Sequence, residues 1–354
     1  MRARRRSNGS RLGDVARLAG VSTATVSRVL NASGPVSQEY RAKVLRAVDA
    51  LDYHPNAHAR TLASGRSSQI GLLISDIANP FFPELVKSIE RAAFRHGFEV
   101  LLAQTDYDSH RLARSVQRFL ERSVAGVIIM ASELSLSLLD GLARRRVPLV
   151  LLDLHTGWSG TSTVRVDYAS GIDEAVRHLA GLGHRHLAFI SGPLGFASAA
   201  ARLAAFREAF DHYVDSEQRP LVLEADFRLE GGLRAATKML ASRPRPTAVL
   251  AANDWMAMGV LKVCRAAKLR VPDDISIVGF DDIAVADLTD PPLSTVCLPR
   301  EELGRRAVEV LMLSLGSQSR APADVRVHTR FVPRGTTGPV HRSRVESRPP
   351  GLAE

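Results

Sequence analysis

A short stretch near the N-terminus gathers side chains that suit contact with nucleic acid. In GVSTATVSRVLN, residues 20–31, three hydroxyls and one guanidinium lie within six residues: Thr23, Thr25, Ser27 and Arg28. Hydroxyls can bond phosphate oxygens, and arginine can bond the O6 and N7 of guanine together. A solvated surface helix has the same composition. Two interpretations therefore stand at this point, a solvent-facing helix or a helix placed in the major groove of DNA.

The positive charge of the chain is concentrated around this stretch. The 354 residues carry a net charge of +10, and residues 1–65 hold 11 Lys and Arg against four Asp and Glu. The other residues hold 36 Lys and Arg against 33 Asp and Glu. A basic first segment on a nearly balanced body indicates an appended nucleic-acid-binding module.

Three short helices are predicted to position the stretch. The first covers residues 12–20, the second begins after Ser22 as its N-cap, and the third covers residues 37–53 with Ser37 as its N-cap. Ala16, Gly20 and Val26 supply a small residue, a turn glycine and a branched apolar residue, which let two helices pack nearly perpendicular. This helix-turn-helix geometry leaves one face of the second helix free. Residues 56–63 could add a two-turn helix, which is marginal by itself.

From Gln69 onward, apolar runs alternate with amphipathic helices. Eight runs are predicted as buried strands, at residues 70–77, 100–106, 126–132, 149–154, 186–192, 221–226, 248–254 and 275–282. Such alternation predicts parallel sheets covered on both faces, and the length of the span favours two similar subdomains. Since ligands bind beyond the carboxyl ends of parallel strands, the polar residues that end these runs should line a cleft between the sheets.

Other classes of function are disfavoured by what the sequence lacks. Two cysteines, Cys264 and Cys297, cannot build a disulfide framework, and no apolar run has the form of a signal peptide or a membrane span. This argues for the cytoplasm and against a sugar-transport component. Neither a dinucleotide-binding G-x-G-x-x-G turn nor a G-x-S-x-G elbow is found, which disfavours an oxidoreductase and a hydrolase. His184 and His186 are interpreted as surface residues. We therefore expect no catalytic activity, no metal and no cofactor.

Six ordered blocks carry a family resemblance that covers the chain from Leu12 to Arg334. They are GDVARLAGVSTATVSRVLN, HPNAHARTLASG, IGLLISDIANPFFPELVKSIE, GLGHRHLAFISGP, AANDWMAMG and VPDDISIVGFDD. These blocks resemble the lactose-repressor/galactose-repressor family of bacterial transcription regulators. The resemblance implies a helix-turn-helix headpiece, a hinge helix and a core like periplasmic sugar-binding proteins. It also implies a homodimer, or a tetramer, that represses transcription at a pseudo-palindromic double-stranded operator and responds to a small effector.

The resemblance also implies roles for individual residues in DNA binding. Base reading falls to Thr23, Ala24 and Arg28, and contact with the DNA backbone falls to Ser22, Thr25, Ser27 and Asn31. In the hinge, Leu62 matches a wedge that enters the minor groove, with Ala59 and Asn56 beside it. A core leucine is the alternative for Leu62.

Effector binding is assigned in the same way to nine residues. They are Asp76, Phe81, Asp153, Phe196, Ser198, Phe227, Asn253, Asp254 and Asp281. Carboxylates and amides can bond sugar hydroxyls, and aromatic rings can cover apolar sugar faces. Helix capping at a strand end is the alternative for the aspartates. Family members often carry arginine at the positions of Phe196 or Ala200, and here only Arg202 remains nearby. A neutral sugar or polyol is therefore favoured over an anionic or purine effector.

The predicted fold is an all-α helix-turn-helix headpiece joined to an α/β core of two doubly wound parallel-sheet subdomains. The headpiece with its N-terminal arm spans residues 1–54, and the hinge and linker span 55–68. The core spans 69–338. Its N-subdomain covers about 69–165 and 297–327, and its C-subdomain covers about 166–296 and 328–338. Residues 339–354 are predicted to be a disordered tail.

Overall fold

The computed structural model describes most of the chain in seven segments. These are residues 12–30, 34–53, 67–134, 147–153, 161–214, 219–316 and 322–340. Contacts divide the chain into two compact units, residues 1–67 and 68–354. Each unit has its own hydrophobic core and is described by itself.

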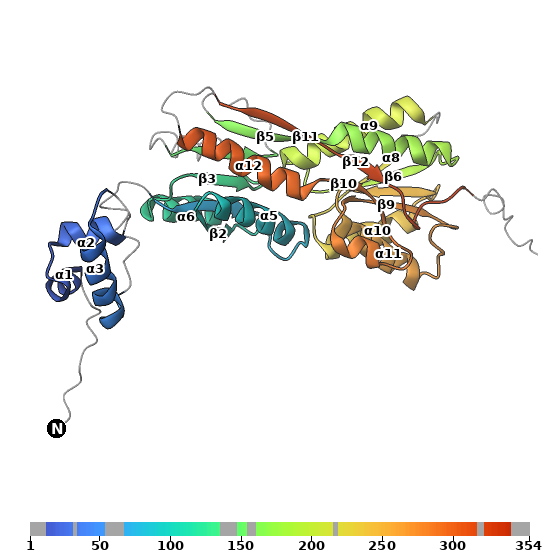
Figure 1. The fold of residues 1–354 in the computed structure, drawn as a ribbon. Helices are drawn as coiled ribbons and strands as arrows, with labels where there is room; N and C mark the ends of the chain where they lie inside the picture. Colours follow the sequence, from blue (N-terminus) through green and yellow to red (C-terminus); the bar gives the residue numbers. More distant parts are fainter. Residues whose placement is uncertain are drawn as a thin grey trace, which may run out of the picture. The chain divides into compact units, whose positions relative to one another are not determined.

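The described residues of the first unit form the three helices that the sequence predicts for residues 12–53. Its helices are α1 (Leu12–Ala19), α2 (Thr23–Leu30) and α3 (Gln38–Ala50) (Figure 1). Val15, Val26 and Val44, one from each helix, are fully buried against one another. Gly20 takes a φ of 65° and ends α1, with the Val21 amide donating to the Ala16 carbonyl over 3.0 Å. A residue without a Cβ adopts this left-handed turn at little cost, so the chain can turn sharply into α2.

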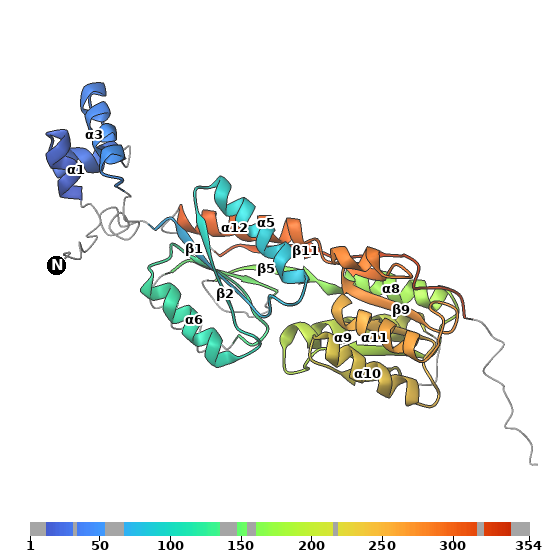
Figure 2. The ribbon, with the colours of Figure 1, turned by 90° about the horizontal axis from the view of Figure 1, so that it is seen from below.

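The second unit contains two six-stranded sheets. The first has the order β11-β5-β4-β3-β1-β2, and all its strand pairs are parallel. Its helices α5 (Phe81–Arg95) and α12 (Arg300–Leu315) cover one face, and α6 (Ser109–Glu121) covers the other (Figure 2). The strands are β1 (Gln69–Ile74), β2 (Glu99–Gln104), β3 (Val127–Met130), β4 (Leu149–Leu152), β5 (Ser162–Asp167) and β11 (Asp324–His328).

The second sheet has the order β12-β10-β9-β8-β6-β7, with α8 (Tyr168–Gly181) and α9 (Ala197–Tyr213) on one face and α10 (Leu229–Ala241) and α11 (Asp254–Ala266) on the other (Figure 1). Its strands are β6 (Leu187–Ser191), β7 (Leu221–Glu224), β8 (Ala248–Ala251), β9 (Ser276–Asp281), β10 (Ser294–Cys297) and β12 (Arg330–Val332). A short 3-10 helix, Ala284–Leu288, follows β9. Among the described strands, β12 departs from the predicted parallel arrangement, because it pairs antiparallel with β10.

All eight predicted strands are present, and four further strands were not predicted. The strands that the sequence analysis did not predict are β5, β10, β11 and β12. They lie where the chain passes between the two sheets: β5 leads into α8, β10 leads into α12, and β11 leads into β12. These strands are short or alternate polar and apolar residues, so they lack the continuous apolar run typical of a buried central strand.

His184 corrects an expectation from the sequence, because it is not a surface residue. Its side chain is 2% exposed. Its ring nitrogens lie 2.9 Å from the Thr247 hydroxyl, 3.0 Å from the Ser276 hydroxyl and 3.0 Å from the Gly338 carbonyl. Burial lowers the pKa of His184 to about 4, so the ring is neutral at pH 7. It joins the C-terminal segment to β9. Among the described segments, none of the helices combines the length and apolar character needed to span a bilayer.

Candidate functional site

The outer face of α2 carries the three residues assigned to base reading. Thr23, Ala24 and Arg28 are exposed, whereas Val26 and Val29 on the opposite face are buried against α1 and α3. Helical spacing produces this separation, because residues three or four apart share a face. The structure therefore brings the predicted base-reading side chains onto one accessible surface.

The hydroxyls beside this face have a local structural role as well. Ser22 caps α2, since its Oγ accepts the Thr25 amide over 3.1 Å, and it lies 2.9 Å from the Thr25 hydroxyl. Ser22 thereby fulfils its predicted capping role. Ser27 is half-buried on the same helix. Asn31 and the hinge residues Asn56, Ala59 and Leu62 lie outside the described residues.

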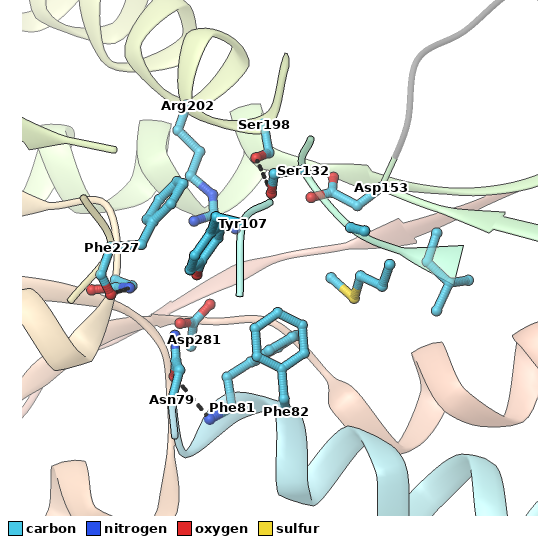
Figure 3. A pocket seen from close by; sticks show the side chains of 14 residues that line it. Asn79, Phe81, Phe82, Tyr107, Ser132, Asp153, Ser198, Arg202, Phe227 and Asp281 are labelled. Carbon is cyan, nitrogen blue, oxygen red and sulfur yellow. Dashed lines mark hydrogen bonds between the residues drawn. The ribbon is translucent and has the colours of Figure 1, made fainter. Parts of the chain in front are cut away.

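A pocket lies between the two sheets of the second unit, at the carboxyl ends of their strands (Figure 3). Its free volume is about 40 Å³, room for a few water molecules. Its wall comes from both halves of the unit: Asn79, Phe81, Phe82, Tyr107, Met130, Ala131, Ser132, Leu152 and Asp153 from one half, and Ser198, Arg202, Phe227, Asn253 and Asp281 from the other. Six of the nine residues assigned to the effector line this pocket. The arrangement is a polar centre enclosed by aromatic side chains.

Arg202 is the cation at the centre of the pocket. It projects from α9 and is 7% exposed. Its Nη1 donates to the Ala252 carbonyl over 2.7 Å, and its guanidinium carbon lies 4.7 Å from the Tyr168 ring centroid and 4.4 Å from that of Phe280. Its Nε is buried without a partner among the described residues. An unmet donor on a buried charge is costly unless something bonds it, so this Nε is suited to a ligand oxygen.

Two buried carboxyl groups face this cation. Asp153 accepts a short hydrogen bond from the Tyr168 hydroxyl, and Asp281 ends β9. Burial raises the pKa of Asp281 to about 7, although the nearby guanidinium of Arg202 lowers it. The pocket thus combines one fixed positive charge with carboxyl groups that accept hydrogen bonds from hydroxyls.

Two other predicted residues line the pocket while serving the fold. Asn253 caps α11, since its Oδ1 accepts the Met256 amide over 2.8 Å, and its Nδ2 donates to the Phe227 carbonyl over 2.8 Å. Ser198 lies with its Oγ 3.4 Å from that of Ser132 across the two halves. Helix capping, considered above for the aspartates, therefore accounts for the Oδ1 bond of Asn253, while its Nδ2 bond holds the Phe227 carbonyl.

Three of the nine residues assigned to the effector do not line the pocket. Asp254 is fully buried, and its carboxyl accepts the Thr295 hydroxyl over 2.5 Å and the Ile283 amide over 2.8 Å. Asp76 forms a local turn with the Ala78 amide over 2.9 Å. Phe196 precedes α9 and stacks on Tyr107 with centroids 5.9 Å apart.

Sequence reasoning left out eight residues of the wall, most importantly Tyr107 and Arg202. Tyr107 directly follows Asp106 at the end of a predicted strand, and this position could have identified it. Arg202 lies in the otherwise alanine-rich run ASAAARLAAF, four residues after Ser198. The position of this single arginine, one helical turn from the predicted pocket residue Ser198, could have identified it.

Unusual backbone conformations gather at the same strand ends. Six of the nine described non-glycine residues with positive φ follow or end strands that lead to the pocket: Asp106, Tyr107, Asp153, Phe227, Asp281 and Asp282. For an aromatic residue such a conformation costs roughly 1–3 kcal/mol and persists only where its surroundings impose it. This clustering is typical of a binding site.

Comparison with known proteins identifies both units. Residues 11–56 match the model for bacterial regulatory proteins of the lacI family, and residues 176–337 match the periplasmic binding protein-like domain. The transcriptional regulator DegA of Bacillus subtilis is 34% identical over 93% of this chain and 98% of its own length. The chain belongs to the lacI family of bacterial regulatory proteins.

Two further comparisons cover this lacI-family regulator across both units. The ribose operon repressor of Escherichia coli is 36% identical over 84% of this chain and 91% of its own length. The crystal structure of the Lac repressor dimer bound to operator and an anti-inducer superimposes with a TM-score of 0.83 at 31% identity, over 94% of this chain and 100% of that one. The regulator is thus a DNA-binding transcription factor with a headpiece and a periplasmic-binding-protein-like core.

Proposed function

We propose that this regulator represses transcription as a homodimer whose two α2 helices read the halves of a pseudo-palindromic operator. A neutral sugar or polyol bound in the pocket between the sheets changes its affinity for DNA. The single observation that carries the proposal is the outward face of α2, where Thr23, Ala24 and Arg28 are exposed above a buried apolar face. A two-fold protein requires a two-fold operator, so one such face serves each half-site.

The nature of the effector is inferred from the pocket. Arg202, Asp153 and Asp281 can bond hydroxyl groups, while Phe81 and Phe227 can cover apolar ring faces. With two carboxyl groups beside one guanidinium, the pocket disfavours an anionic ligand. A sugar also agrees with the ribose operon repressor as a relative. The relatives are regulators, which supports action by binding in the cytoplasm, without catalysis or a cofactor.

Arg28→Ala is expected to cost about 1–3 kcal/mol of binding free energy at one base position in each half-site. Its guanidinium would no longer bond a base edge, whereas contacts with the backbone would persist. The operator is first selected from a random duplex pool, and binding is then measured over single-base variants. Arg46→Ala, an exposed arginine of α3, is the control. A uniform loss at every operator position would reject the base-reading role of Arg28.

A thermal-shift screen of the full chain tests the effector. Neutral sugars and polyols, including D-ribose, should raise the melting temperature by mass action, whereas sugar phosphates and purines should not. A carboxylate accepts more hydrogen bonds than a carboxylic acid, so binding should favour the ionised form of Asp281. Its pKa of about 7 means that roughly one-tenth is ionised at pH 6 and nine-tenths at pH 8. The affinity of a sugar should therefore rise about tenfold from pH 6 to pH 8.

Asp281→Asn is the matched variant for this measurement, because it keeps the shape and removes the titration. It should remove the dependence of affinity on pH. A stabilising sugar that binds equally at both pH values would contradict the role of Asp281. Stabilisation by purines or sugar phosphates alone would contradict the neutral-sugar assignment.

A further inference from the structure

Two dipeptides meet across the pocket from opposite halves of the second unit. Asp106 and Tyr107 follow β2, and Phe227 and Arg228 precede α10. The Tyr107 ring stacks on the Phe227 ring with centroids 6.3 Å apart and an interplanar angle of 23° (Figure 3). Each dipeptide thus carries one aromatic ring and one charge, which is negative at Asp106 and positive at Arg228. These four residues are called the cleft latch below.

The charged members of the cleft latch form an ion pair. Arg228 Nη2 lies 2.5 Å from Asp106 Oδ1, and Arg228 Nε lies 4.0 Å from Asp76 Oδ2. The guanidinium carbon of Arg228 also lies 5.8 Å from the Tyr107 ring centroid. Asp106 and Asp76 belong to one half and Arg228 to the other, so this contact joins the two halves directly. Separation of the sheets would break the ion pair and the ring stack together.

The backbone of the cleft latch is held in a costly conformation. Asp106, Tyr107 and Phe227 have φ angles of 57°, 60° and 63°. Aspartate tolerates this left-handed region, whereas aromatic residues such as Tyr107 and Phe227 adopt it only where their surroundings impose it, and such conformations cluster at ligand clamps and switches. Two such aromatic residues in one four-residue contact indicate that the loops are shaped for this contact.

The closed latch leaves too little room for a ligand. The free volume behind it is about 40 Å³, whereas pockets that hold small molecules usually have roughly 300–1,000 Å³. Tyr107 and Phe227 both line the pocket and stack across its two halves, so widening the pocket to sugar size by moving the halves apart must part the two rings. Resting on the proposed function, we propose that the cleft latch holds the effector cleft closed and that its opening limits effector binding and release.

The rate at which a thiol inside the pocket reacts measures this opening without any effector. In the full chain, Ser198→Cys places a thiol at a position that is 6% exposed, and its reaction with a disulfide reagent is followed. Cys264 and Cys297 are buried and give the background rate in the chain with Ser198 intact. In the Ser198→Cys chain, Arg228→Gln and Asp106→Asn should each raise the labelling rate about 1.5- to fivefold, as expected for a half-exposed ion pair.

The double variant Arg228→Gln/Asp106→Asn tests whether the two residues act together. It should label about as fast as either single variant, because the pair is already broken in each. Raising NaCl from about 50 to 500 mM should speed labelling when the pair is intact and leave Arg228→Gln unchanged. Arg270→Gln is the control, since it removes the ion pair of the exposed Arg270 with Asp274 (3.2 Å) in the same half, and it should label at the parental rate.

Three results would overturn the proposal. They are unchanged labelling in both single variants, multiplied effects in the double variant, and an equal rise in the labelling of Cys264 and Cys297, which would indicate general loosening. The assay contains neither DNA nor sugar. A result against the cleft latch therefore does not contradict the proposed operator and sugar binding. A result against operator or sugar binding likewise leaves the labelling rates unchanged.

Discussion

Arg202→Met is expected to lower the free energy of unfolding of the core by about 3–5 kcal/mol, the usual loss when one partner of a buried charge cluster is removed. Methionine keeps much of the apolar stem but leaves Asp153 and Asp281 without the guanidinium. It also removes the donor to the Ala252 carbonyl and the cation that packs on Tyr168 and Phe280. Urea denaturation of the full chain measures the change.

The loss in Arg202→Met should depend on pH in a definite direction. The folded-state pKa of Asp281 is about 7, above its usual 3.8, so stability falls as the pH rises between these two values, where the group is ionised in the unfolded chain and protonated in the folded one. Without Arg202 this pKa rises further, and the variant should lose more stability at pH 8 than at pH 6. Arg207→Met, an exposed position of the same helix, should change stability by less than about 0.5 kcal/mol. A loss of that size in Arg202→Met as well would contradict the central role of the cation.

Asp254→Ala is expected to cost about 2–4 kcal/mol of stability, because it leaves two buried hydrogen-bond donors without an acceptor. Those donors are the Thr295 hydroxyl of β10 and the Ile283 amide that follows β9. Burial raises the pKa of Asp254 well above its usual value, and the nearby Asp281 raises it further. The protonated form is therefore favoured, and this form resembles an amide in shape and hydrogen bonding. Urea denaturation again measures the change.

Asp254→Asn distinguishes a hydrogen-bonding role from a role in charge. Its oxygen can accept the Ile283 amide, and the Thr295 hydroxyl can turn to accept from its NH₂ group. We expect this variant to lose only about 1 kcal/mol. If asparagine cost as much as alanine, the carboxyl would be needed as a charge. Asp254 would then have to be reconsidered as part of the polar centre beside Asp281.

The periodicity of the sequence was sufficient for most of the fold. Continuous apolar runs identified β1, β6 and β8, since these strands are buried on both faces and need no polar residue. The four strands where the chain passes between the sheets, β5, β10, β11 and β12, were not predicted because they lack such continuous apolar runs. In β11 only Val327 is buried, so its local pattern does not differ from that of a polar loop. Such strands are stabilised by pairing with distant partners, here β5, which local composition does not record.

The headpiece and the strand ends could be predicted from sequence because their chemistry is local. Capping by Ser22, the turn at Gly20 and the alternation of Val26 with exposed Arg28 depend on residues within one or two helical turns. Only the tertiary structure decided which of the strand-end groups lie together in the pocket. It placed Asp281 in the pocket but used Asp254 inside the core, brought Arg202 to the centre, buried His184 and joined Asp106 to Arg228. These outcomes depend on the distances between segments and on desolvation, and both arise only when two sheets far apart along the chain pack against each other.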